Sequence, residues 1–589
     1  MATPAAPFAA PQSNSCCTGQ LCAGSCDGSR HRSSGRRFAH PSKPKVQARG
    51  VVPWLAFLLA TVLAALLLHQ PPAAAQAPSA VRAAAALRVA SAFDPQTMDP
   101  HAIALLYHSR VAFQVHDSLV GRDEKFKLEP ALALSWHMTA PTVWRFRLRP
   151  GVRFHDGSPF TAEDAVFSLE RALTAPSQRA FQLKGVASVR KIDALSIEVQ
   201  LDAPDAVLPE KLQYVAMMNK AWCEKHGVQK AQDFNGKQET YAVRNANGTG
   251  PFQLVRYEPD VRTTLQRFAA WWGWADPRSG NLEQVSLTTI KSDATRLAAL
   301  ASGEVDLVLD PPYQDVARLK ADSRISTQQR PDIGQQYLTF DQTRDELEGS
   351  DVKGRNPFKD LRVRKAVYHA INMPLIVDKV LRGQAVPTGA FLSPLVDGSP
   401  AELDQRLPYD PARSRQLLGE AGYPNGFAVP LDCVNVAWRE NVCQAVAAML
   451  TQVGIRTTLR TSPSNQFFPK LSQGTAAFIE YGWTASPDAW NSLNGLFRSY
   501  DKAGLGTFNA GRYSNPKLDL LIDNIRTEPD LTRRRAMVST VLRIVADELP
   551  YVPLYRRTLT WAMNKRVSLV QWPNDQLELR WVKVRPAAS

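Results

Sequence analysis

Apolar and polar positions along the chain follow two different periods. In residues 143–149, apolar side chains occupy every second position with basic side chains between them, which predicts a strand with one buried face. Residues 86–92 predict an earlier strand, and residues 94–101 predict an irregular loop that contains two Asp-Pro steps. A helix is expected to follow this loop and to continue through about Asp117.

Short polar side chains mark the predicted starts of several helices. Thr161 precedes Asp164 by three residues, as in a capping box, and Asp360 and Asp410 precede two further helical segments. The apolar repeats at helical spacing are Val166, Leu169 and Leu173, and then Val363, Ala366, Val367 and Ala370. Helices and short strands alternate in this way over most of the chain, so the sequence predicts an α/β fold.

One stretch of the 589-residue chain is apolar enough to enter a lipid bilayer. Residues 51–68 form an uncharged run that follows basic residues and precedes a tract of small residues, which is the order of a secretory signal. We predict an unstructured leader at 1–50 and a signal peptide at 51–75 that is cleaved after Ala75. An uncleaved anchor is the alternative. In both cases the folded part is exported.

The composition excludes some classes of protein. Hydrophobic residues make up 44% of the chain and charged residues 21%, which is typical of a globular protein rather than a disordered or polytopic membrane protein. The formal net charge is +15, but seven basic residues and one acidic residue lie in residues 1–75. No basic stripe interleaved with aromatic residues follows, so we expect no nucleic-acid partner.

Cysteine and histidine positions do not form a recognisable metal site. After residue 75 the chain contains Cys223, Cys433 and Cys443, which permits one disulfide, with Cys433 and Cys443 the closest pair, or three free thiols. His101 and His108 would share a helical face, which suggests nickel or haem, but no ligand cluster at a known spacing supports that interpretation. We therefore predict no cofactor and no metal.

Five ordered blocks of sequence resemble a known family. They are LRPGVRFHDGSPFTAEDAVFSLERAL (148–173), GTGPFQL (248–254), NPFKDLRVRKAVYHAIN (356–372), YDPARSRQLLGEAGYPNGF (409–427) and RYSNPKLDLLID (512–523). Together they resemble the extracytoplasmic solute-binding proteins that serve peptide, nickel and opine ABC importers. The blocks also have structural reasons to exist. Gly248 to Pro251, for example, would let the chain approach a neighbouring backbone.

The resemblance implies a type II periplasmic-binding-protein fold, in which two discontinuous lobes joined by two hinge crossings close around a ligand. Lobe one would comprise residues 86–335 with the C-terminal tail 556–589, and lobe two residues 336–555. The protein would be a monomer of the Gram-negative periplasm. It would deliver a small solute, such as a peptide, to ABC permease subunits in the inner membrane without catalysis.

The resemblance also places the ligand near residues 481–490. Dipeptide- and oligopeptide-binding members of the family carry an Asp for the ligand's ammonium group where this chain has Ser486, and a hydroxyl cannot neutralise a buried charge. Asp488 could take that role, or it could cap a helix that begins near Ala489. Trp483 and Trp490 could line an apolar pocket, although Trp490 could instead belong to the core.

A second candidate segment precedes a helix predicted at 441–453. The resemblance places an Arg for the ligand's carboxylate near Trp438 and Arg439, and a solvated surface charge is the alternative. Tyr107 is the candidate from lobe one. The predicted ligand-binding residues are therefore Tyr107, Trp438, Arg439, Tyr481, Trp483, Ser486, Asp488 and Trp490.

Two other classes of function remain open from the sequence. The chain lacks the G-x-S-x-G and H-E-x-x-H motifs, but an exported hydrolase that uses a pair of carboxylates needs no such motif. A ligand sensor or chaperone would use the same fold and the same closure as an importer component. Turnover of a substrate would identify the hydrolase.

Overall fold

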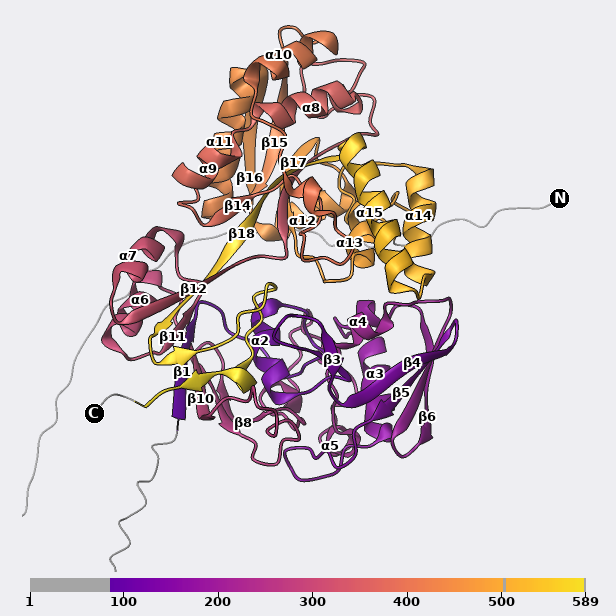
Figure 1. Ribbon diagram of the computed structural model, residues 1–589, viewed down its shortest axis with the longest axis vertical. Coiled ribbons are helices and arrows are strands. Elements are labelled where there is room, and N and C mark those ends of the chain that lie inside the picture. The colour runs from indigo at the N-terminus through magenta and orange to yellow at the C-terminus, as the bar shows by residue number, and fades with distance from the viewer. Residues whose placement is uncertain (1–84, 502–504, 587–589) are drawn as a thin grey trace, which may run out of the picture. The chain divides into compact units, whose positions relative to one another are not determined.

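The structure is a computed structural model that describes residues 85–501 and 505–586 (Figure 1). These residues belong to one compact unit, Val81–Ser589. The predicted leader at 1–50 and the signal peptide at 51–75 lie outside the described residues. Among the helices that the structure describes, none has the length and apolar character needed to cross a lipid bilayer.

The central sheet of the described residues contains twelve strands. Ten of them lie side by side in the order β16 (Ile455–Ser462), β15 (Phe427–Val434), β17 (Phe478–Trp483), β13 (Gln335–Phe340), β18 (Tyr551–Asn564), β11 (Leu307–Leu309), β1 (Ala85–Ser91), β10 (Leu282–Thr289), β9 (Arg262–Arg267) and β8 (Phe252–Glu258). The other two, β12 (Ile325–Pro331) and β14 (Ala385–Pro387), also pair with β18.

Smaller sheets complete the β structure of the described residues. A four-stranded antiparallel sheet has the order β4 (Ala133–Ala140), β5 (Val143–Leu148), β7 (Ser196–Leu201) and β6 (Val186–Asp193). Two-stranded pairs are formed by β2 (Val120–Arg122) with β3 (Leu128–Pro130), and by β19 (Val567–Ser568) with β20 (Lys583–Val584).

Helices pack around these sheets. Their bounds are α2 (Leu106–Val115), α3 (Ala162–Leu173), α4 (Leu208–Leu212), α5 (Lys220–Lys225), α6 (Asp293–Ser302), α7 (Val316–Ala321), α8 (Leu361–Ala370), α9 (Met373–Lys379), α10 (Pro411–Glu420), α11 (Ala437–Gln452), α12 (Ser464–Gln473), α13 (Trp490–Leu496), α14 (Pro516–Thr527) and α15 (Leu531–Glu548). Single 3₁₀ turns lie at Ala180–Leu183, Tyr241–Val243, Tyr313–Asp315, Pro357–Lys359, Ala401–Asp404 and Leu579–Trp581. Helix α11 packs against β15 and β16, while α8 contacts α10 and α14 contacts α15.

Strand β18 belongs to both parts of the central sheet (Figure 1). Its first half pairs with β13 and β14, and its second half pairs with β11 and β12. Strands β12 and β13 are consecutive in the chain and are separated only by residues 332–334. The chain therefore passes between the two parts of the sheet twice, once between β12 and β13 and once within β18.

Buried apolar side chains form separate clusters on the two sides of these crossings. One cluster is built mainly from residues between 333 and 555 and includes Phe358 and Phe478. Another joins β1, β10 and β11 to residues of the C-terminal segment, including Leu87 and Trp561. Each part of the sheet thus has its own core, which allows the two parts to move as bodies about the crossings.

Local sequence signals correspond to observed elements. Strand β5 buries every second side chain along most of its length, as the alternation predicted. Thr161 and Asp164 form the predicted capping box of α3, and Asp360 and Asp410 accept backbone N–H groups at the starts of α8 and α10. These features depend on residues that lie a few positions apart in the chain, so the sequence alone predicts them.

Helix α11 begins earlier than the sequence predicted. It starts at Ala437 instead of residue 441, so that Trp438 and Arg439 lie within its first turn. Its N-cap residue is Val436, whose side chain accepts no hydrogen bond, and the sequence therefore carries no start signal there. The structure also bonds Cys433 in β15 to Cys443 in α11, which resolves the pairing that the sequence left open.

Candidate ligand-binding site

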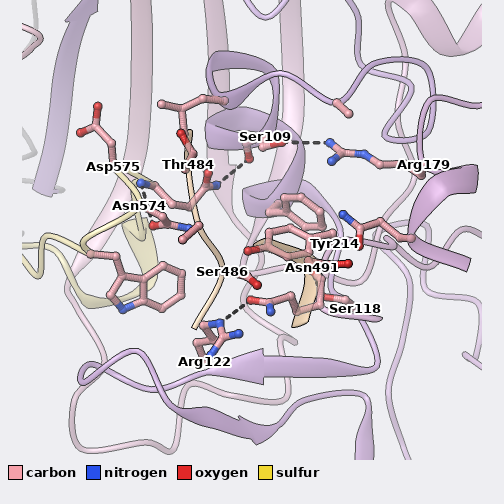
Figure 2. Close-up of a pocket in the computed structure, with 18 of the residues that line it drawn as sticks. Ser109, Ser118, Arg122, Arg179, Tyr214, Thr484, Ser486, Asn491, Asn574 and Asp575 are labelled. Atoms are coloured by element: carbon pink, nitrogen blue, oxygen red, sulfur yellow. Dashed lines mark hydrogen bonds between the residues drawn. The ribbon is translucent and has the colours of Figure 1, made fainter. Parts of the chain in front are cut away.

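A cavity of about 910 Å³ lies between the segments on the two sides of the crossings. It is lined by residues of α2 and the segment after it, by the segment around Arg179, by the segment from Trp483 through α13, and by residues 572–580. Figure 2 shows part of this lining, including Ser118 and Tyr214. A volume of this size fits a small organic solute rather than a protein or a bare ion.

Two of the eight predicted residues, Trp483 and Ser486, line this cavity. Trp483 ends β17, its indole Nε1 donates to Ser492 Oγ at 2.9 Å, and its ring centroid lies 5.0 Å from that of Phe508. The Ser486 hydroxyl donates to the backbone oxygen of Asp488 at 2.8 Å. Both side chains are therefore held in place and present uncharged surface to the cavity.

Two predicted charged contacts are neutralised inside the protein. Arg439 Nη2 lies 2.7 Å from the fully buried carboxylate of Glu480. Asp488 forms an ion pair with Arg534, and its Oδ1 accepts the backbone N–H of Trp490 at 2.8 Å, which is the capping alternative. Desolvation raises the pKa of both carboxyl groups against the effect of the neighbouring guanidinium groups. Neither Arg439 nor Asp488 is among the described residues that line the cavity.

Trp490 lies where the segment around α4 meets α14. The Nζ atom of Lys211 lies 5.0 Å from the indole centroid, and the guanidinium carbon of Arg526 lies 5.3 Å from it. Arg526 Nη2 is 3.5 Å from Asp205 Oδ2, and its backbone oxygen accepts the N–H of Ala206 at 3.0 Å. Trp490 thus contacts residues from both sides of the cavity, but it is not among the described residues that line the cavity.

We expect Arg526→Gln to weaken the contacts of the Arg526 side chain with Trp490 and Asp205. The substitution should therefore favour separation of the two sides of the cavity. Because the ion pair is partly exposed, the effect should be modest, a two- to fivefold rise in Kd for a ligand of the cavity, or about 0.4–1 kcal/mol. Titration calorimetry and small-angle scattering of the unliganded protein measure these changes. Arg533→Gln, which changes an exposed side chain on α15 that pairs with Glu528 at the end of α14, should change neither.

The remaining predicted residues lie elsewhere. Tyr107 stacks on Phe93 with ring centroids 5.3 Å apart. Tyr481 is buried, and its hydroxyl donates to the backbone oxygen of Phe508 at 3.2 Å. Trp438 is half-buried in the first turn of α11. None of these three is among the described residues that line the cavity, and their contact with a ligand stays a prediction.

Arg179 is a cavity residue that sequence reasoning missed. It is 3% exposed, its Nε donates to the backbone oxygen of Pro100 at 3.3 Å, and its Nη2 donates to Ser109 Oγ at 2.9 Å (Figure 2). Its guanidinium carbon lies 5.7 Å from the centroid of the Phe113 ring. Desolvation lowers the pKa of Arg179 to about 10. No local pattern distinguishes this Arg from a surface residue, because tertiary packing alone buries it.

Asp117 is a second missed residue. It follows α2 and lines the cavity, where its Oδ2 accepts the indole N–H groups of Trp272 at 2.9 Å and Trp271 at 3.2 Å. Burial raises the pKa of Asp117 to about 6. The run of tryptophans at 271–274 was the one sequence signal that could have pointed to an unusual site.

An ion pair bridges the two crossings at the edge of the cavity. Arg557 in β18 contacts Asp332, which follows β12, with an Nη2–Oδ2 distance of 2.6 Å, and the backbone oxygen of Arg557 accepts the N–H of Asp332 at 2.8 Å. Both residues line the cavity. A ligand in the cavity would therefore lie against the segments about which the two sides can rotate.

One group of side chains among the described residues has potential metal-ligand atoms within 4.8 Å of one another: Cys433, Cys443 and Glu480. The two sulfur atoms are joined in a disulfide and so offer no thiolate, and Glu480 is paired with Arg439. His101, which suggested nickel or haem, is buried with Nε2 2.9 Å from the backbone oxygen of Ala216. These arrangements have structural explanations.

Comparisons with known proteins agree with this geometry. A sequence model described as bacterial extracellular solute-binding proteins, family 5 Middle, matches residues 127–504. The glutathione-binding protein GsiB of Escherichia coli (strain K12) is 28% identical over 485 residues, which cover 80% of this chain and 89% of GsiB. HbpA2 from Haemophilus parasuis has a similar structure, with a TM-score of 0.72 and 23% identity over 85% of this chain and 100% of HbpA2. DppA from Helicobacter pylori, in complex with the peptide STSA, has a TM-score of 0.68 and 23% identity over 85% of this chain and 98% of DppA.

Proposed function

The chain belongs to the bacterial extracellular solute-binding proteins of family 5, and we propose that it is the periplasmic binding component of an ABC importer. In this role it captures a peptide or peptide-like solute and delivers it to permease subunits in the inner membrane. The predicted two-lobed type II fold is confirmed by the solved structures that the chain resembles. The observation that carries the proposal is the 910 Å³ cavity, which residues from both sides of the two crossings line.

We assign lobe one to residues 86–335 with the tail 556–589, and lobe two to residues 336–555. The separate apolar clusters support this division, although a few side chains such as Val207 and Trp572 pack into the cluster of the other lobe. A ligand favours closure only as far as it contacts both lobes. The lining of the cavity supplies such contacts, with Ser118 and Tyr214 on one side and Trp483 and Asn491 on the other.

The proposed ligand class is a peptide or peptide-like molecule. The relative GsiB is named for glutathione, a modified tripeptide, and 89% of its length is covered by this chain. The cavity combines aromatic surface from Trp272, Trp483 and Trp572 with hydroxyl and amide side chains such as Ser486 and Asn491. This mixture is suited to amide groups and short side chains.

The proposal includes export through the predicted signal peptide, a monomeric state and binding without turnover. The family consists of binding proteins, which favours capture over hydrolysis. A sensor or chaperone would bind the same ligand by the same closure. Incubation of the pure protein with bound peptide separates binding from hydrolysis, because a hydrolase would release shorter products.

The proposal predicts that a bound solute stabilises the native protein. Native mass spectrometry of protein purified without refolding should reveal a retained small molecule. After that cargo is removed, trialanine or glutathione at 100 times its Kd should add about 2.7 kcal/mol to the free energy of unfolding, because it binds only the native state. Thermal denaturation with and without the peptide measures this shift.

A variant that fills the cavity provides the matched test. Ser486→Trp adds a large side chain at the lining and should abolish the thermal shift, whereas Leu520→Trp adds the same bulk at a side chain that is 66% exposed on α14 and should preserve it. An unchanged melting curve for the unaltered protein across a broad panel of peptides and metabolites would contradict the proposed function.

A further inference from the structure

Charged side chains that line the cavity divide into two groups. The first group interacts within the protein: Arg122 pairs with Glu210, Arg557 with Asp332, Asp575 with Arg110, and Arg580 with Glu129 and Glu578, and Lys184 also has an interaction within the protein. Arg179 and Asp117, by contrast, form no ion pair with any residue that the structure describes. These two side chains are the ones whose charges are left for a ligand to neutralise.

The surroundings of Arg179 favour an anion. Its donors meet the neutral oxygen atoms of Pro100 and Ser109, and its second terminal nitrogen, Nη1, has no hydrogen-bond partner among the described residues. A buried cation without a counter-ion is costly, because neutral acceptors replace only part of the lost hydration. A carboxylate in the cavity would supply both the missing charge and the missing acceptor.

The surroundings of Asp117 favour a cation. Two indole N–H groups, of Trp271 and Trp272, orient its carboxylate but carry no net charge. The nearby Arg149 stacks on the Trp272 ring with its guanidinium carbon 4.0 Å from the ring centroid, and Arg580 is engaged by Glu129 and Glu578. An ammonium group in the cavity would therefore meet a carboxylate that forms no ion pair with any described Lys or Arg, although the charge of Arg580 lowers its pKa.

We propose that Arg179 receives the ligand's carboxylate and Asp117 its ammonium group, so that the cavity selects zwitterionic peptides with both groups free. This inference rests on the proposed function and names the groups that carry its specificity. It does not give these two charge-pairing roles to Arg439 and Asp488, because Glu480 and Arg534 already neutralise their charges.

Both charged groups lie on the same side of the crossings. The described lining residues that the other side contributes are all uncharged: Trp483, Thr484, Ala485, Ser486, Asn491, Ser492, Asn494, Gly495, Thr507 and Phe508. The ligand is therefore expected to dock first on the side that carries Asp117 and Arg179. Closure then adds neutral contacts, which tolerate different peptide side chains.

Titration calorimetry with trialanine and glutathione tests the two assignments separately. Arg179→Gln should weaken binding of the free peptides by about 10- to 100-fold, the range for a lost charged hydrogen bond, but should hardly change binding of trialanine amide. Asp117→Asn should show the converse pattern, weakening free trialanine but not N-acetyl-trialanine. Arg190→Gln, which changes an exposed side chain on β6 that pairs with the buried Glu198 of β7, is the control and should leave every Kd unchanged.

The empty protein gives an independent readout. Because Arg179 is buried without a counter-ion among the described residues, Arg179→Gln should leave Tm of the ligand-free protein unchanged or raise it, whereas a purely structural Arg would cause a fall of several degrees. Such a fall, or equal losses for free and amidated peptide, would overturn the inference. If the unaltered protein bound neither trialanine nor glutathione, this inference would fail together with the assigned peptide class. Unaltered binding by Arg179→Gln would refute the inference alone.

The dependence of affinity on pH supplies a third test of this proposal. Burial raises the pKa of Asp117 to about 6, so in the empty protein this group binds a proton below that pH and can no longer pair with an ammonium group. Affinity for trialanine should therefore be highest near pH 7, where Asp117 is ionised and the α-amino group of the peptide is still protonated, and should fall by up to tenfold per pH unit below pH 6.

Other titratable and charged groups lie near Asp117. Their contributions to the pH dependence must be distinguished from that of Asp117. Glu578, whose pKa burial raises to about 7, and Glu129 are acidic neighbours, Arg149 and Arg580 are cationic, and burial lowers the pKa of His116 to about 4. Asp117→Asn should abolish the pH dependence near 6. Persistence of the full dependence in this variant would assign it to Glu578 and contradict the role of Asp117.

Discussion

Arg171→Met is expected to lower the free energy of unfolding by about 3–5 kcal/mol, the range for breaking a buried ion pair by removing one partner. Arg171 Nη2 lies 2.7 Å from Asp99 Oδ2, and both side chains are fully buried. Arg171 also donates to the backbone oxygens of Val228 and Lys230. The substitution would leave the Asp99 carboxylate buried without a counter-ion.

This ion pair stabilises a segment that leads to the cavity lining. Burial by itself would raise the pKa of Asp99, but Arg171 outweighs burial and holds that pKa well below its usual range. The carboxylate also accepts the backbone N–H groups of His101 and Gln232. Loss of the pair should therefore loosen the loop that leads into α2, whose first residues line the cavity.

Urea denaturation followed by tryptophan fluorescence measures the effect. The matched control is Lys191→Met, which breaks an exposed pair with Glu163 at 2.7 Å and should cost no more than about 1 kcal/mol. A loss for Arg171→Met as small as that of the control would mean that water reaches Asp99 in solution, and the pair would then not be a structural element.

Gly248→Ala is expected to destabilise the protein by about 3 kcal/mol or more, at the upper end for overpacking. A Cβ atom at this position would lie 1.9 Å from the backbone oxygen of Val115 and 2.9 Å from His116 Nδ1. The first of these atoms belongs to backbone at the end of α2, so the clash cannot be relieved by a side-chain rotation. The end of α2 would have to move, and Asp117 with it.

Two measurements separate the outcomes for Gly248→Ala. Thermal denaturation reports the loss of stability, and titration with trialanine reports the displacement of Asp117. Gly419→Ala is the control, because no atom lies within 4 Å of the added Cβ in helix α10 and Ala favours the helix by up to about 1 kcal/mol. Equal stability of the two variants would show that the contact between Gly248 and Val115 is not maintained in solution.

The GTGPFQL block illustrates how far the sequence alone could be interpreted. Its glycines predicted a close approach to some neighbouring backbone, and the structure confirms the approach and identifies Val115 as the partner. The partner is 133 positions away in the chain, and no local pattern encodes that separation. Capping at Thr161 and alternation in β5 were predictable for the opposite reason, since they depend on residues a few positions apart.

Arg439 and Asp488 show what sequence reasoning could not supply. Arg439 and Asp488 were reasonable partners for a ligand as long as their own neighbours were unknown. Glu480 pairs with Arg439 from β17, and Arg534 pairs with Asp488 from α15. Whether a charge is free for a ligand depends on every charge that the fold places near it, and this property cannot be derived from one segment.

The sequence by itself determined the alternation of helices and strands, the helix caps, the glycine that permits close packing and the membership in a family, because each depends on residue types at fixed spacing along the chain. Only the tertiary structure decided that Cys433 bonds Cys443, that Arg439 and Asp488 are neutralised, and that Asp117 and Arg179 line the cavity without an ion pair to any described residue. Burial and charge pairing are set by contacts between segments far apart in the chain, and it is these contacts that turn ordinary acidic and basic residues into a binding site.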